Sequence, residues 1–354
     1  MKIVLDINHP AHVHIFRNFL CEMKERGHEF LILASEKDLT YSLLENYGIP
    51  FVKIRNGKTL LRKIGSIPLQ NLQILKAVAK FNPDLFLGAG SIRAAHVSFL
   101  LRRPCISFDD DEYSYPYYHF FVGVICGFSG FKKRGPKIIK IDSYKEMAYL
   151  HPNYFTPNPQ VLEKIGISPY EKYCIVRFVS WTAFHDIGKK GFDDRSKLDL
   201  IKYLSERCTV YISSEAPLPE SLQKYQLKIS PEHIHDLLYY ATLLISDSQT
   251  MTTESAILGT PAIRCNSFVG EHDMGNFVEL EQDYGLIFNF NNSKSAIDKA
   301  LALLNDPVLK TKWAEKRKEL LRKKIDVTPF MVWFIENFPH SFSYMKNKQS
   351  EQSI

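Results

Sequence analysis

Short apolar runs alternate with amphipathic stretches along the first part of the chain. Residues 2–7 form an apolar strand, and Val13, Phe16, Leu20 and Met23 then recur at helical spacing until a glycine ends the helix. The same alternation predicts further strands at 28–34, 84–87, 104–108 and 137–141, and helices at 69–81 and 92–101. Strands separated by helices are typical of a parallel, doubly wound sheet, whose ligands sit beyond the carboxyl ends of the strands.

The pattern repeats after a linker that is punctuated by Pro152, Pro157, Pro159 and Pro169. Beyond it we expect strands at 173–179, 210–213, 243–245, 261–264 and 286–290, and helices at 196–206, 233–241, 252–258 and 295–304. A long charged helix at 307–324 and an apolar segment at 329–338 follow, and the polar tail 341–354 is expected to fray. The sequence thus predicts an α/β fold with two Rossmann-type domains, residues 1–165 and 166–327, the first completed by a C-terminal helix at 328–345.

Composition supports two domains and excludes several kinds of protein. The chain has 354 residues, 45% of them hydrophobic, which exceeds what one core usually holds. Its formal net charge of +6 is modest and the basic residues are spread among acids, so nucleic acid is not indicated as a partner. Six cysteines without CxxC spacing indicate neither a zinc site nor a disulfide framework, and a strand at residue 2 leaves no room for a signal peptide. We therefore expect a cytoplasmic protein.

One basic stretch stands apart from this even distribution. Residues 131–137, with the sequence FKKRGPK, follow an aromatic run at 113–128. The apolar part of that run, 120–128, is too short to span a bilayer and contains Gly123 and Gly127. We expect a packed or domain-facing helix here, because aromatic stretches are usually core; the alternative is peripheral contact of 117–137 with an anionic membrane or a lipid-linked acceptor.

The most informative segment is 246–266, where a buried strand meets a hydroxyl-rich loop and a helix start. Ser248, Gln249 and Thr250 cluster where unpaired N–H groups and the positive end of the helix dipole favour phosphate oxygens. Glu254 lies about a turn and a half deeper, where a carboxylate can accept the hydroxyls of a ribose. This arrangement predicts a nucleotide-sugar site. The alternative is ordinary helix capping, for which Ser, Thr and Asp are common residues.

Three histidines follow the first strand. His9, His12 and His14 are expected in the turn after that strand, facing a cleft. Imidazole titrates near neutrality, so His12 or His14 could take a proton from an acceptor hydroxyl, with His9 on the acceptor side. Metal binding is the weaker alternative, because no carboxylate follows at a defined spacing.

Four consecutive acids, Asp109 to Glu112, stand at a strand carboxyl end. Like charges this close raise one another's pKa toward neutrality, so Asp110 is a candidate general base and Glu112 an acceptor-side residue. The alternative is a solvated loop with a capping aspartate. Gly90 and Ser91, two further candidates on the acceptor side, follow the preceding strand, where glycine allows close approach of a ligand to the backbone.

These motifs resemble a known family. Residues 9–14, 152–155, 181–188 and Asp247-Ser248 with Glu254 and 259–261 together resemble the uncharacterised DUF354 family, itself considered GT-B-like. The donor loop resembles that of GT-B glycosyltransferases and of non-hydrolysing UDP-N-acetylglucosamine 2-epimerases. The resemblance implies two domains facing each other across a cleft, a UDP-linked donor and no metal or other cofactor.

The resemblance also implies roles for residues of the second domain. His185 stands where the epimerases place a phosphate-contacting histidine, and Arg177 would neutralise the leaving diphosphate, unless it forms a salt bridge within its domain. His272, Asp273 and Asn276 stand where transferases contact the sugar, with helix capping as the alternative. A nucleotide base could rest at 230–235. The epimerases carry an acid after the strand that ends near residue 88, and this chain has Gly88-Ala89-Gly90-Ser91 instead.

Three functions follow from these observations. The leading one is a metal-independent glycosyltransferase that moves a sugar from a nucleoside-diphosphate sugar to a glycan or lipid-linked acceptor in polysaccharide biosynthesis. The second is a sugar-nucleotide epimerase, which the missing acid disfavours. The third is a nucleotide-sugar binder without catalytic activity. Fold analogy alone does not decide between them.

Overall fold

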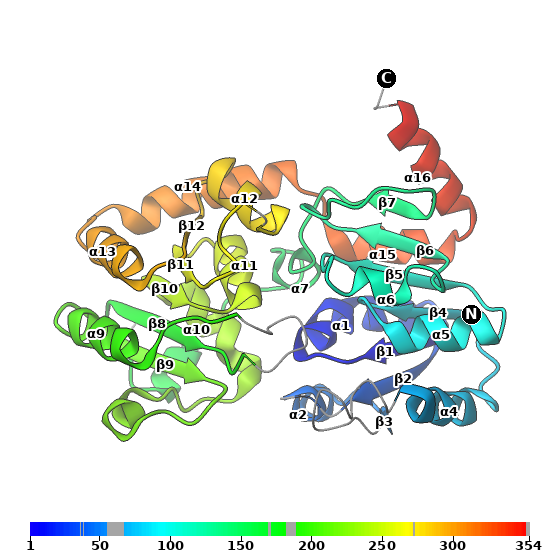
Figure 1. Cartoon of the computed structure of the whole chain (residues 1–354), viewed down its shortest axis with the longest axis horizontal. Coiled ribbons are helices and arrows are strands. Elements are labelled where there is room, and N and C mark those ends of the chain that lie inside the picture. The colour runs from blue at the N-terminus through cyan, green and yellow to red at the C-terminus, as the bar shows by residue number, and fades with distance from the viewer. Residues whose placement is uncertain are drawn as a thin grey trace. The chain divides into compact units, whose positions relative to one another are not determined.

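The computed structural model describes residues 1–35, 37, 39–54, 67–168, 171–181, 189–271 and 273–351. Contacts divide the chain into two compact units (Figure 1). Unit 1 comprises residues 1–149 and 324–354, and unit 2 comprises residues 150–323. The first division falls earlier than the expected boundary at 165, so the proline-rich stretch belongs to unit 2.

Unit 1 is built on a seven-stranded sheet in the order β3-β2-β1-β4-β5-β6-β7, with every neighbouring pair parallel. This is the doubly wound arrangement that the sequence predicts, with its topological switch point between β1 and β4. The strands are β1 Lys2–Ile7, β2 Glu29–Ser35, β3 Val52–Ile54, β4 Leu85–Gly88, β5 Cys105–Asp109, β6 Val124–Gly127 and β7 Ile138–Lys140.

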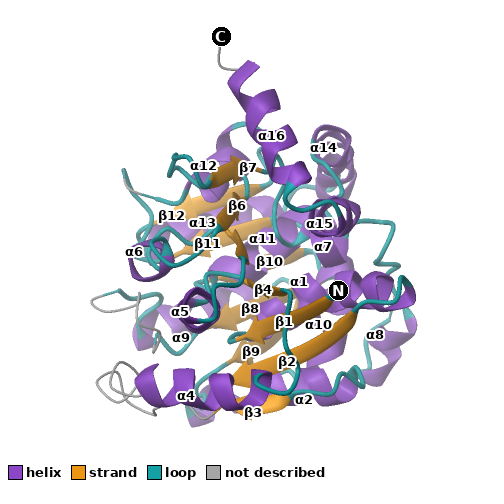
Figure 2. Ribbon diagram, turned by 90° about the vertical axis from the view of Figure 1, so that its right-hand side faces the viewer, coloured by secondary structure: helices purple, strands orange, loops and turns teal. Residues whose placement is uncertain are grey.

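Helices cover both faces of this sheet. On one face α1 packs against α15, and on the other α4 packs against α5 and α5 against α6 (Figure 2). The right-handed crossover between parallel strands places consecutive helices on opposite faces once the strand order reverses. The helices of this unit are α1 Pro10–Glu25, α2 Thr40–Asn46, α4 Ile67–Val78, α5 Ile92–Leu100, α6 Tyr115–Tyr118, α15 Val327–Glu336 and α16 His340–Glu351, with α7 Met147–Leu150 at the division between the units.

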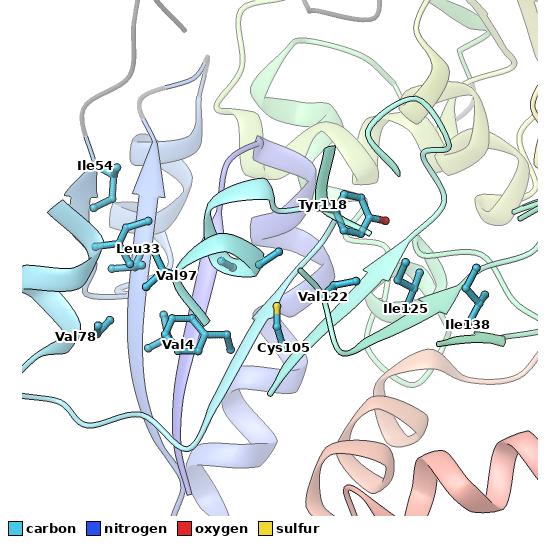
Figure 3. Packing of buried hydrophobic residues seen from close by; sticks show 14 of the residues in the cluster. Val4, Leu33, Ile54, Val78, Val97, Cys105, Tyr118, Val122, Ile125 and Ile138 are labelled. Carbon is cyan, nitrogen blue, oxygen red and sulfur yellow. The ribbon is translucent and has the colours of Figure 1, made fainter. Parts of the chain in front are cut away.

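An apolar core fills the space between the sheet of unit 1 and helices α4, α5 and α6. Val4 and Leu33 from the strands cluster with Val78 and Val97 from the helices, and Tyr118 of α6 belongs to the same cluster (Figure 3). Each of these side chains is at most 1% exposed, so burial of apolar surface anchors the strands at the switch point.

Unit 2 has a five-stranded parallel sheet in the order β12-β11-β10-β8-β9, with its switch point between β8 and β10. The strands are β8 Tyr173–Phe178, β9 Thr209–Ser214, β10 Leu243–Ser246, β11 Ala262–Cys265 and β12 Ile287–Phe290. The helices are α8 Gln160–Lys164, α9 Asp194–Ser205, α10 Ile234–Tyr240, α11 Gln249–Leu258, α12 Gly275–Gln282, α13 Ser293–Leu304 and α14 Leu309–Lys323, with short 3₁₀ helices at Glu220–Tyr225 and Pro231–His233.

Two sequence predictions about secondary structure are wrong. Residues 120–128, expected as a helix, contain strand β6, because Val124 and Ile125 are β-branched and favour a strand. The tail, expected to fray, forms α16 against β7. Lys346 Nζ donates to the carbonyls of Gly135 and Ile138 over 3.1 Å each, and Gln349 Nε2 donates to Lys140 O over 2.8 Å.

Candidate functional site

The switch point of unit 2 lies at the start of α11. Ser248 caps this helix, because its backbone is extended and its Oγ accepts from Met251 N over 3.4 Å. Ser246 Oγ in turn accepts from Ser248 N over 2.8 Å, and Thr252 Oγ1 donates to Ser248 O over 2.6 Å. Capping, the alternative considered for these hydroxyls, is thus what Ser248 does. The first-turn N–H groups that follow, at Gln249 and Thr250, have no partner inside the helix by its geometry.

Gln249 carries a buried donor at the first position of α11. Its Nε2 is enclosed and has no hydrogen-bond partner among the residues that the structure describes. Buried amides are almost always hydrogen-bonded, so a donor of this kind at a helix start suits an acceptor oxygen of a ligand.

Glu254 lies deeper in α11 and is held by a second helix. Its Oε1 accepts from His235 Nε2 of α10 over 2.9 Å, and both side chains are buried. The sequence assigned 230–235 to a nucleotide base, whereas the structure turns His235 toward Glu254. This hydrogen bond fixes the carboxylate in position.

Asp247, part of the motif that follows β10, has the most strongly raised pKa among the described acids of unit 2. Burial raises the pKa of its carboxyl to about 7, against hydrogen bonds from Val179 N over 2.8 Å and Trp181 Nε1 over 3.4 Å. A side chain at Gly191 would overlap this carboxylate. Asp247 therefore ties the loops after β8 and β10 together at the switch point and can hold or release a proton near neutral pH.

Trp181 has a backbone that tryptophan rarely adopts. Its φ is 53°, in the left-handed region, and its indole ring stacks on Phe268 with centroids 6.2 Å apart. Strained backbone of this kind costs energy and gathers at functional sites. Residue spacing and composition do not predict this left-handed backbone at Trp181. His185 and the rest of 182–188 lie outside the described residues, as does His272.

Arg177 is paired within its own unit. Its Nη2 lies 2.6 Å from Glu215 Oε1 and its Nη1 donates to Ser213 Oγ over 2.8 Å, because β8 and β9 place residues 177 and 213 side by side. This is the salt bridge within the domain that was the alternative for Arg177. The carboxylate of Glu215 offsets the positive charge of Arg177 that would otherwise face a diphosphate.

Around α12 the structure separates two sugar-contact candidates. Asp273 pairs with the fully buried Arg264 of β11, and its Oδ1 accepts from Met274 N over 2.8 Å at the helix start. The ion pair with Arg264 thus accounts for Asp273, whereas the expected capping is not found, because the N-cap residue of α12 is Met274 and no side chain caps the helix. Asn276 is 4% exposed and its Oδ1 has no hydrogen-bond partner in the described part of the chain, so this amide remains a candidate for a ligand.

In unit 1 the three histidines divide between the turn after β1 and the helix that follows it. Helix α1 begins at Pro10, whose missing N–H suits the first helical position, and His9 precedes the helix and caps it by accepting from Ala11 N at Nδ1 over 3.1 Å. His14 is buried, with its ring 6.0 Å from that of Tyr47 and 5.3 Å from that of Tyr149. The predicted turn is therefore confirmed for His9 and wrong for His12 and His14, which lie in α1.

His12 keeps a chemical role open. Burial, with the charges of Lys145, Lys37 and Arg93, lowers the pKa of its imidazole to about 3. Its Nδ1 is enclosed without a hydrogen-bond partner among described residues. The ring is therefore neutral at pH 7, and an anion bound beside these cations would raise its pKa and make it a stronger proton acceptor.

Beneath the histidines a buried ion pair spans the switch point of unit 1. Arg93 Nη2 lies 2.5 Å from Asp6 Oδ1 and its Nε donates to Oδ2 over 3.2 Å, while Nη1 contacts Ser35 Oγ. Ser91 also donates to Asp6 and caps α5 by accepting from Ala94 N over 3.1 Å. Ser91, expected on the acceptor side, is thus part of the framework that joins β1, β2 and α5.

In the acid cluster Asp109 titrates near neutrality, whereas the sequence indicated Asp110 as the candidate general base. Burial, then the charges of Asp111 and Asp110, raises the pKa of Asp109 to about 7, although Tyr118 donates its hydroxyl over 2.5 Å. Asp110 is neutralised, since Lys145 Nζ donates to its Oδ1 over 2.7 Å. Glu112 accepts the N–H groups of residues 132 and 133 and so holds a loop.

Gly90 lies directly against Asp109. Its φ is 57°, and a Cβ built on it would stand 2.9 Å from Asp109 Oδ2. Its N–H donates to Ser107 Oγ over 2.9 Å. A carboxylate from β5 therefore occupies the space into which a side chain at position 90 would project. Within the described ranges no group of three or more His, Cys, Asp or Glu side chains is placed to hold a metal ion.

The two doubly wound units define the class of protein, and solved structures agree. The chain has the GT-B-like fold of a Staphylococcus aureus MnaA structure with UDP (TM-score 0.70, 12% identity, 96% of this chain and 97% of that one). It also resembles the spinosyn rhamnosyltransferase SpnG (TM-score 0.63, 12% identity, 95% and 100%) and the UDP-GlcNAc 2-epimerase of Methanocaldococcus jannaschii (TM-score 0.58, 12% identity, 90% and 99%).

The chain belongs to the DUF354 family of proteins of unknown function, whose model matches residues 1–328. A further relative is the uncharacterised protein MJ0665 of Methanocaldococcus jannaschii. The two are 22% identical over 283 residues, which cover 75% of this chain and 82% of MJ0665. Family and fold are therefore established as the sequence analysis expected them.

Proposed function

We propose that the protein is a glycosyltransferase that moves a sugar from a nucleoside-diphosphate sugar, UDP-linked, to a glycan or lipid-linked acceptor in cell-surface polysaccharide synthesis. Proteins of the same fold support this class, since one is a rhamnosyltransferase and another was solved with UDP. Unit 2 would bind the donor and unit 1 the acceptor.

The observation that carries the proposal is the buried donor of Gln249 at the start of α11, which has no hydrogen-bond partner among the described residues. It stands beside the N–H groups of a ten-residue helix and one turn from the fixed carboxylate of Glu254. A diphosphate offers the acceptor oxygens that these donors need, and a ribose offers the hydroxyls that a carboxylate accepts. Asn276 would contact the sugar.

Unit 1 supports the proton transfer that glycosyl transfer requires. As the acceptor oxygen forms its bond to the anomeric carbon, its proton must leave, and the carboxylate of Asp109 can take it because its pKa lies near pH 7. His12, neutral at this pH, is the other candidate. The bond from the anomeric carbon to the diphosphate breaks, and N–H donors at α11 meet the charge that develops there.

Binding of UDP tests the donor site directly. Isothermal titration of Gln249→Ala should show UDP affinity reduced about 10- to 100-fold, the usual value of a hydrogen bond to a charged group. Gln223→Ala serves as the matched control, because Gln223 is an exposed glutamine of the same unit. Equal affinities of the wild type and Gln249→Ala would refute the assignment of the diphosphate to α11.

An epimerase is the second candidate, and Gly90 favours it. This chain has no acid at position 90, but the carboxylate of Asp109 on the neighbouring strand occupies the space into which a side chain there would project, and in an epimerase it would take the role of that acid. Incubating UDP-N-acetylglucosamine alone and following its anomeric proton by NMR separates the two reactions, because an epimerase produces a second nucleotide-sugar and a transferase without acceptor does not. Binding of UDP with neither reaction would indicate a binder without catalysis.

We also propose that the reaction needs no metal ion. The N–H groups of α11 and the amide of Gln249 would stabilise the leaving diphosphate in place of a cation. Transfer measured with and without EDTA tests this, and a loss of activity that Mg²⁺ or Mn²⁺ restores would contradict it. A reducing compartment such as the cytoplasm is the proposed location, since thiols such as those of Cys174 and Cys208 remain free there.

A further inference from the structure

Unit 1 has an exposed apolar patch that is not part of its hydrophobic core. It lies where α5 ends and where the chain passes from α6 to β6. Phe120 is 72% exposed, Leu100 62% and Phe99 58%, and Tyr117 and Phe121 are exposed as well. These five residues are the aromatic patch. Single exposed apolar residues are ordinary, but contiguous ones mark interaction surfaces.

A ring contact links the two segments of the aromatic patch. The rings of Phe99 and Phe121 are edge to face with centroids 5.4 Å apart, and within the second segment the ring centroid of Phe120 lies 4.0 Å from that of His119. Helices α5 and α6 are in contact, so the two segments stay together. With side chains of 150–250 Å² about half exposed, the aromatic patch presents on the order of 500 Å², near the upper end for a monomer.

The two segments that carry the aromatic patch are basic. Segments 91–108 and 113–141 contain no Asp or Glu; the four acids 109–112 lie between them, and Glu112 accepts from the backbone N–H groups of residues 132 and 133. The exposed cations of the two segments are Arg102, Arg103, Lys132, Lys133, Arg134 and Lys137. Lys137 Nζ donates to Phe120 O over 3.1 Å, and Lys133 Nζ lies 5.9 Å from the centre of the Tyr115 ring, which stacks on His119.

Exposed apolar side chains beside these cations fit an anionic lipid surface better than a second copy of this chain. Two copies meeting through this surface would bring like charges together, which costs energy, whereas lipid phosphates offer the opposite charge. Aromatic rings among basic residues also suit the interface between headgroups and acyl chains. No helix of the described residues is long and apolar enough to cross a bilayer, so contact would be peripheral.

We propose that the aromatic patch and its flanking cations dock unit 1 on an anionic membrane. The rings and Leu100 enter the headgroup region and the cations contact lipid phosphates. The sequence considered only 117–137 for such contact, and the structure adds the end of α5. Vesicle binding needs neither nucleotide nor catalysis, so its outcome is independent of the proposed transferase function.

Flotation of the full chain with vesicles tests the proposal. Vesicles of phosphatidylcholine with about 30 mol% phosphatidylglycerol should bind the protein, and pure phosphatidylcholine should bind it far less. Arg102→Gln with Arg103→Gln should weaken binding roughly 30-fold, at about fivefold for each cation near the surface. Lys318→Gln with Arg322→Gln is the matched control, because these exposed cations lie on α14 of unit 2.

The apolar part is tested by Leu100→Ser with Phe120→Ser. We expect at least about tenfold weaker binding to the anionic vesicles, with Leu198→Ser of α9, 44% exposed, as the control. Circular dichroism establishes that each variant is folded. Equal binding of the wild type and both patch variants would overturn the proposal. A dimer that forms without lipid and is lost in Leu100→Ser with Phe120→Ser would overturn it too, because the patch would then be covered by a second copy.

Discussion

Replacing Asp109 with asparagine should change how the stability of unit 1 depends on pH. The wild-type carboxyl is 4% exposed and its pKa is raised by burial from 3.8 to about 7. Asparagine has the same shape, can still accept from Tyr118 and has no charge to lose. The variant therefore removes one titration while it keeps the packing against Gly90.

The sign and size follow from the two pKa values. The folded protein holds a proton that the unfolded chain has lost, so this proton stabilises the fold fully below pH 3.8 and the effect disappears as pH rises through 7. At pH 5, two units below the folded pKa of Asp109, it contributes roughly 2.7 kcal/mol at 1.36 kcal/mol per unit, and at pH 8 close to nothing. The wild type should thus lose roughly 2.7 kcal/mol relative to Asp109→Asn between these pH values.

Urea titrations at both pH values measure this difference. Because two units can unfold separately, the transition is best followed by pulsed hydrogen exchange at peptides of β4 and β5, which report on unit 1. Asp84→Asn is the control, since Asp84 is an exposed aspartate of the same unit. If the gap between wild type and Asp109→Asn is the same at pH 5 and pH 8, Asp109 is not protonated in the fold and cannot be the near-neutral acid of the site.

Two further predictions concern pairs of side chains. Arg93→Met leaves the fully buried carboxylate of Asp6 without its cation, so urea titration should show the free energy of unfolding reduced by about 3–5 kcal/mol. Adding Asp6→Asn in a double variant should restore part of this stability. An unchanged urea transition in Arg93→Met would contradict the buried ion pair. The sulfurs of Cys174 and Cys208 lie 3.2 Å apart, so diamide should oxidise the two thiols to one disulfide. Intact mass spectrometry should then show the wild type lighter by two hydrogens, while Cys208→Ser keeps its full mass. A wild type whose mass does not fall after diamide treatment would refute the prediction.

Much of the fold can be predicted from the sequence, because strand and helix periods are local. Alternation of apolar runs and amphipathic stretches gives the parallel sheets in both units, with most element ends within a few residues. Short apolar stretches are harder, since a buried strand and a buried helix share the same composition; β6 was mistaken for this reason. The C-terminal tail was also predicted wrongly, because α16 is held by hydrogen bonds to carbonyls at β7, which is far away in the chain.

The sequence by itself determined the family, the doubly wound architecture and the position of α11 behind a strand carboxyl end, because these follow from residue order and local periodicity. Only the tertiary structure decided which polar groups are already satisfied. Lys145 neutralises Asp110 from 35 residues away, and Glu215 offsets Arg177 from the neighbouring strand. Asp109 is left with a raised pKa, and Gln249 with a buried donor that has no partner in the described part of the chain, because burial and charge balance depend on neighbours that are distant in the sequence.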